Sequence, residues 1–86
     1  MDLNLHMKMG MHHLERVLSY APMVEEDGRA TVHLTFEDWN VLADTLFHMN
    51  TPREALPESV TDYRLANENR IIQIEADGLT IDVDIM

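Results

Sequence analysis

The sequence predicts an α+β domain: a small, mostly antiparallel sheet of three or four strands with two helices packed on one face and a C-terminal β-hairpin. Apolar residues recur at helical spacing in two segments, around residues 11–21 and 36–49. Near the C-terminus, two β-rich runs flank an Asp-Gly pair, which is typical of a hairpin turn. Helices and strands in this order pack as helices covering one face of a sheet. With 86 residues, the chain forms a single small acidic domain over residues 1–86.

The N-terminal segment fits two patterns. Residues 3–11 alternate between apolar and polar side chains, which predicts a strand to about residue 8. Beyond Gly10 the apolar positions share one helical stripe, so we expect a helix that begins near Met11 and ends at Pro22. The stripe consists of Met11, Leu14, Val17, Leu18 and Ala21.

The middle of the chain predicts a turn, a strand and a second helix. Gly28 closes an acidic turn, and residues 31–36 then alternate as in a strand. Thr35 has the side chain of a helix N-cap, so we expect a helix from Phe36 to Met49 that stops before Pro52. Its buried stripe consists of Trp39, Leu42, Ala43, Leu46 and Met49.

Residues 51–69 carry a weaker pattern. Pro52 and Pro57 interrupt any long element. Ser59 is a suitable N-cap for a short helix that carries Val60, Tyr63 and Ala66, and a loop with one helical turn fits as well.

The C-terminal segment predicts a hairpin with a defined register. Asp77-Gly78 joins the runs 70–76 and 79–85, and a two-residue loop determines which residues face each other. One face then holds only apolar pairs: Ala76 with Leu79, Ile74 with Ile81, and Ile72 with Val83. The other face pairs Glu75 with Thr80, Gln73 with Asp82, and Ile71 with Asp84. Turn chemistry and hydrophobic pattern select the same register.

The charge of the chain excludes several classes of partner. Asp and Glu number 16 against 6 Lys and Arg, a formal net charge of −10. Six cations are too few for a surface that neutralises phosphates, so we expect no direct nucleic-acid binding and no binding to anionic membranes. The sequence has neither an apolar run long enough to span a membrane nor the pattern of a signal peptide, so we expect a cytoplasmic protein.

Acidic residues without nearby cations form the candidate binding surface. Residues 71–86 contain four carboxylates and no Lys or Arg, and a second acidic cluster occupies the turn before Gly28. The expected partner-binding residues are Glu75, Asp82, Asp84, Asp77, Glu25, Glu26 and Asp27. The alternative interpretation is a solvated sheet face that aids solubility and blocks edge pairing.

The N-terminus also carries soft metal-binding side chains. Thioethers and imidazoles bind Cu(I). On a strand, however, alternate methionines stand about 7 Å apart, too far to share one ion. Methionine as core filler is the simpler interpretation, so we predict no metal site and no cofactor. The residues in question are His6, Met7, Met9, Met11, His12 and His13.

The sequence lacks the residues and motifs of common enzyme active sites, which argues against an enzyme. There is no cysteine and no Gly-rich phosphate loop, and the two serines lie outside any nucleophile motif. We expect a small acidic protein-interaction module that binds a basic surface of another protein. One specific form is an inhibitor that mimics nucleic acid, as small phage or mobile-element proteins do. The alternatives are a homo-oligomeric assembly protein, such as a homodimer formed through the N-terminal strand or Phe47, and a Met/His metal-binding protein.

Overall fold

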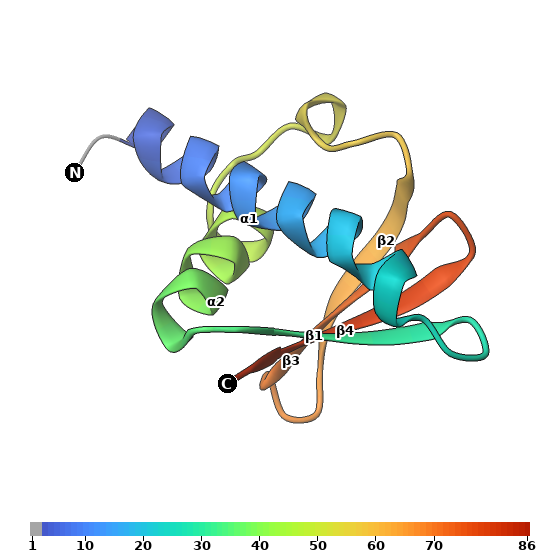
Figure 1. Cartoon of the computed structure of the whole chain (residues 1–86). Helices are drawn as coiled ribbons and strands as arrows, with labels where there is room; N and C mark the ends of the chain where they lie inside the picture. Colours follow the sequence, from blue (N-terminus) through green and yellow to red (C-terminus); the bar gives the residue numbers. More distant parts are fainter. Residues whose placement is uncertain (1–2) are drawn as a thin grey trace.

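The computed structural model describes residues 3–86 and confirms the α+β class (Figure 1). Two helices pack on one face of a four-stranded sheet with the order β1-β4-β3-β2. The sheet is mixed, because β3 pairs antiparallel with β2 and β4 whereas β1 runs parallel to β4. In chain order the elements are α1 (Leu3–Val24), β1 (Arg29–Leu34), α2 (Phe36–Ala43), the π-helical η1 (Asp44–His48), the 3₁₀ turn η2 (Arg53–Ala55), β2 (Val60–Ala66), β3 (Ile71–Ala76) and β4 (Leu79–Ile85).

The predicted N-terminal strand is wrong, because α1 is one continuous helix from Leu3 to Val24. Met1 and Asp2 lie outside the described residues. Gly10 is not a junction between two elements. It is the point where α1 passes so close to Thr45 that a Cβ on Gly10 would lie 1.9 Å from the Thr45 Oγ1. Pro22 does not end the helix but lies in its last turn. The proline ring favours a helical φ, and the position loses only one backbone hydrogen bond near the helix end.

The second predicted helix is confirmed, with a change of helix type partway along it. The Thr35 Oγ1 accepts a hydrogen bond from the Asp38 N–H at 3.2 Å, which caps α2 as expected. After Ala43 the chain continues as the π-helical η1 and leaves the helix at Met49. The Trp39 Nε1 donates to the buried Val83 carbonyl at 2.9 Å, which ties α2 to the sheet.

The expected short helix at Ser59 is wrong, because residues 60–66 form the edge strand β2. Val60 pairs with Ala76 and Tyr63 pairs with Ile74, and the register shifts between them. This bulge leaves Val60 and Tyr63 on the same face although they stand three residues apart, a spacing that resembles a helix. Pairing with β3 therefore determines the structure of this segment.

The C-terminal hairpin has the predicted register. Ile72 faces Val83, Ile74 faces Ile81 and Ala76 faces Leu79, while Gln73 faces Asp82 and Glu75 faces Thr80. Asp77 and Gly78 have φ values of 50° and 80°, as a two-residue type I′ turn requires.

One apolar core lies between the helices and the covered face of the sheet. Its completely buried side chains come from both layers and include Leu14, Val17, Leu42, Ile72, Ile74, Ile81 and Val83. No helix within residues 3–86 is long and apolar enough to cross a membrane.

Candidate functional site

The open sheet face does not lack cations, so that part of the sequence prediction is wrong. Each carboxylate that the hairpin places on this face has an arginine partner contributed from outside the hairpin's two strands. The shortest contacts are Arg29–Asp82 at 2.8 Å, Arg64–Glu75 at 3.2 Å and Arg70–Asp84 at 3.7 Å. A partner that used these carboxylates would have to compete with the protein's own guanidinium groups.

Two of these carboxylates also accept hydrogen bonds from neutral side chains. The Gln73 side-chain amide donates to Asp82 at 2.9 Å, and the Thr80 hydroxyl donates to Glu75 at 2.9 Å. The face is thus a network of paired charges and hydrogen bonds. Its role in partner binding remains a prediction, with fewer unpaired carboxylates than the sequence suggested.

The two acidic turns lie at the same end of the sheet, on the right in Figure 1. Because β1 and β4 run parallel, the turns that precede them are neighbours. The Thr80 N–H donates to the Gly28 carbonyl at 2.9 Å. Both turns are Asp-Gly pairs with positive φ, 54° and 79° in the first and 50° and 80° in the second. The parallel pairing therefore joins two acidic clusters that are far apart in the sequence.

A fifth carboxylate belongs to this surface and was missed in the sequence. The Asp77 N–H donates to the Ser59 carbonyl at 3.2 Å, so Glu58 precedes β2 at the same end. Its place depends on β2 being a strand, which the local pattern did not predict. We call this surface the acidic end, defined by Glu25, Glu26, Asp27, Glu58 and Asp77.

The acidic end has few cations of its own. Within residues 3–86, none of its five carboxylates forms an ion pair. The Glu25 side chain accepts the Gly28 N–H at 2.7 Å, which stabilises the turn. Arg53 is anchored nearby through its hydrogen bond to the Val60 carbonyl at 2.6 Å. Arg29 begins β1 at this end, but its guanidinium lies on the open face against Asp82.

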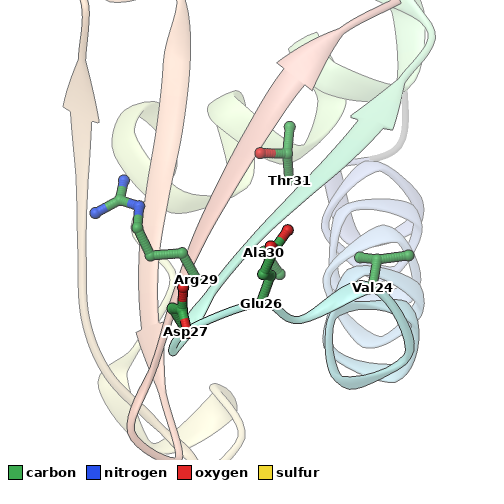
Figure 2. Close-up of a pocket in the computed structure, with 6 residues that line it drawn as sticks. All are labelled: Val24, Glu26, Asp27, Arg29, Ala30 and Thr31. Carbon is green, nitrogen blue, oxygen red and sulfur yellow. The ribbon is translucent and has the colours of Figure 1, made fainter.

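A hollow of about 420 Å³ opens at the acidic end beside β1 (Figure 2). It is lined by Val24, Glu26, Asp27, Arg29, Ala30 and Thr31. Figure 2 shows the Arg29 side chain extending toward the neighbouring strands and away from Val24, at the end of α1. The lining of the hollow therefore combines apolar side chains, two carboxylates and Arg29, whose guanidinium pairs with Asp82.

The edge of β1 borders this hollow. Gly28 and Leu34 direct their carbonyls toward β4, so the alternation of a strand turns the backbone groups of Thr31 and His33 toward the open edge. An extended segment of another chain can pair with such an edge. Carboxylates next to it favour a segment that carries Lys or Arg.

His13 is a buried histidine of α1. Burial lowers its pKa, and Asp38 opposes this effect while Arg16 and His12 reinforce it. The His13 Nε2 lies 3.4 Å from the Asp38 Oδ1, too far for a good hydrogen bond, and has no other partner. Only 8% of the His13 side chain is exposed.

The N-terminal methionines do not form the row that a strand would produce. On α1, successive residues are rotated by about 100°, so Met7 and Met9 point in different directions. Met9 is exposed, whereas Met11 packs against the core. Within residues 3–86, no group of three or more His, Asp or Glu side chains is placed to hold a metal ion.

Phe47 makes an internal contact instead of lying free on the surface. It is partly buried and packs edge-to-face on Tyr63, with ring centroids 5.6 Å apart. Both contacts suggested for a homodimer are thereby altered, since the N-terminal strand is a helix. The homodimer itself remains a prediction.

Comparisons of the chain with protein-family models, with curated proteins and with solved structures find no match.

Proposed function

We propose that this chain is a small acidic protein-interaction domain whose acidic end binds a basic, extended segment of a partner protein. The type of partner that fits is a nucleic-acid-binding protein, whose basic surface the domain would occupy and so inhibit. Binding would combine charge attraction with strand pairing along the edge of β1.

The proposal depends on one observation: parallel pairing of β1 with β4 joins two acidic turns, while Arg29, which begins β1, pairs with Asp82 on the open face. Of the six Lys and Arg residues, Arg29, Arg64 and Arg70 contact carboxylates of the open face. The carboxylates of the acidic end have no such partners within residues 3–86. These unpaired carboxylates therefore place negative charge where the edge strand begins.

Two triple variants with the same change in net charge test the location of the site. The first, E26Q/D27N/D77N, changes the acidic end, and Asn is suited to the positive φ of both turn positions. The second, E75Q/D82N/D84N, changes the open face and is the matched control. The probe is a fluorescently labelled peptide of alternating lysine and threonine, and fluorescence anisotropy gives its dissociation constant over a range of salt concentrations.

We expect the unchanged protein to bind the peptide with an affinity that falls as salt rises. The acidic-end variant should bind at least about tenfold more weakly, and the open-face variant should keep its affinity within about twofold. Equal losses in both variants would mean that net charge alone attracts the peptide. A loss confined to the open-face variant would move the site to that face, and no binding at low salt would refute the proposal.

A further inference from the structure

A second hollow, of about 430 Å³, lies away from the acidic end, where the first turns of α1 pass the end of η1. It is lined by Asn4, Met7, His48, Met49 and Asn50. The proposed docking surface uses none of these residues. The chain therefore has a second hollow that is separate from the acidic end.

Three of the five described residues that line this hollow carry side chains that bind soft metal ions. Met7 and Met49 contribute thioether sulfurs and His48 contributes an imidazole, which together suit Cu(I). Among residues 3–86, no carboxylate lines the hollow. Mg²⁺ and Ca²⁺ require several oxygen ligands, and zinc sites use Cys, His, Asp or Glu, so the lining disfavours these ions.

Contacts on either side of the hollow hold its two walls together. The His6 Nε2 lies 3.4 Å from the Asp44 Oδ2, which links the residue before Met7 to the first residue of η1. One helical turn further along α1, Gly10 meets Thr45. The positions of Met7 and His48 therefore depend on tightly packed backbone rather than on a loose terminus.

The π-helical form of η1 is the second observation that points to a site. Five consecutive residues, Asp44–His48, adopt this rare geometry, which is frequent at functional sites. The Met49 N–H donates to the Asp44 carbonyl at 2.8 Å as the helix ends. The wider turn changes the direction of His48 and Met49 relative to a regular α-helix, and both residues line the hollow.

We propose that Met7, His48 and Met49 form a binding site for Cu(I) between α1 and the end of η1. The site takes one methionine from the N-terminal group and two ligands from η1 and its C-cap. It does not involve Met9, which lies on an exposed part of α1. No reaction is assigned to the site, which binds and releases the ion.

Competition with the chelator bicinchoninate, under ascorbate and without oxygen, measures the affinity of the whole protein for Cu(I). We expect one ion bound with a dissociation constant below about 1 μM. The variant M7L/M49L should bind at least about tenfold more weakly, because Leu keeps the volume and removes both sulfurs. The matched control M9L/M23L changes two exposed methionines of α1 and should bind like the unchanged protein.

A second measurement does not depend on any variant folding. In the unchanged protein, Ag(I) should shift the ¹³C methyl resonances of Met7 and Met49 and leave those of Met9 and Met23 in place. Binding weaker than about 1 μM, equal losses in the two double variants, or shifts confined to Met9 and Met23 would overturn the proposal. Zn²⁺ binding of equal affinity at Met7 and Met49 would overturn the assignment to a soft ion.

Discussion

Replacing Gly10 by Ala tests the packing of α1 against η1, because helix propensity and tertiary contact predict opposite signs. In an isolated helix, Ala is more stable than Gly by about 1 kcal/mol. In this fold the added Cβ would lie 1.9 Å from the Oγ1 and 2.6 Å from the Cβ of Thr45. Thr45 is completely buried, and its hydroxyl donates to the Val41 carbonyl at 2.9 Å, so it cannot move aside freely.

The expected result of Gly10→Ala is a net loss of stability. Overpacking a core typically costs about 1–3 kcal/mol, and a contact this short belongs at the upper end of that range. After subtracting the gain in helix propensity, we expect a loss of about 1–2 kcal/mol. For a domain of this size, that loss lowers the Tm by about 5–15 °C.

Urea unfolding followed by circular dichroism measures the effect, with Ser19→Ala on the exposed side of α1 as the matched control. The control should gain a few tenths of a kcal/mol. In a Thr45→Ala background, Gly10→Ala should cost less by at least about 0.5 kcal/mol, because two of the three clashing atoms are gone. If Gly10→Ala stabilises the otherwise unchanged protein, α1 does not pass as close to Thr45 as the structure indicates. The rigid packing of α1 against η1 beside the proposed Cu(I) site would then be refuted as well.

Three further predictions concern the contacts that hold the helices. Burial lowers the pKa of His13, so its contribution to stability is complete above about pH 6.5 and is lost as the pH falls through 6.5 toward the lower folded value. Urea titrations at several pH values should show this loss in the unchanged protein and a smaller loss in His13→Gln. If the free energy of unfolding falls with pH equally in both proteins, His13 is not the group responsible. Thr35→Ala removes the cap of α2 and should cost about 1 kcal/mol in thermal unfolding, whereas Thr35→Ser should cost less. Trp39→Phe leaves the Val83 carbonyl without its indole donor and should cost about 1–3 kcal/mol by urea unfolding, and a neutral result would show that this bond is not needed.

The parts of the fold that were predicted depend on neighbours in the chain. Asp77-Gly78 determines a two-residue turn, and the turn determines the register of β3 against β4. Thr35 caps a helix that starts at the next residue. In both cases the residues that carry the signal lie within a few positions of the structure that they specify.

The parts that were missed depend on contacts between distant segments. Residues 3–11 satisfy both a strand and a helix pattern, and the approach of Gly10 to Thr45 belongs only to the helix. In β2, the bulge after Val60 replaces the strand alternation with a spacing that resembles a helix. No local pattern distinguishes these alternatives.

By itself, the sequence determined that this is a small acidic α+β domain with a C-terminal hairpin whose covered face is apolar. Only the tertiary structure decided which carboxylates remain without cationic partners. Arg29 reaches Asp82 because β1 lies beside β4, and Arg64 reaches Glu75 because β2 lies beside β3. Charge compensation is a matter of distances in space, and those distances follow from strand order, which local patterns do not encode.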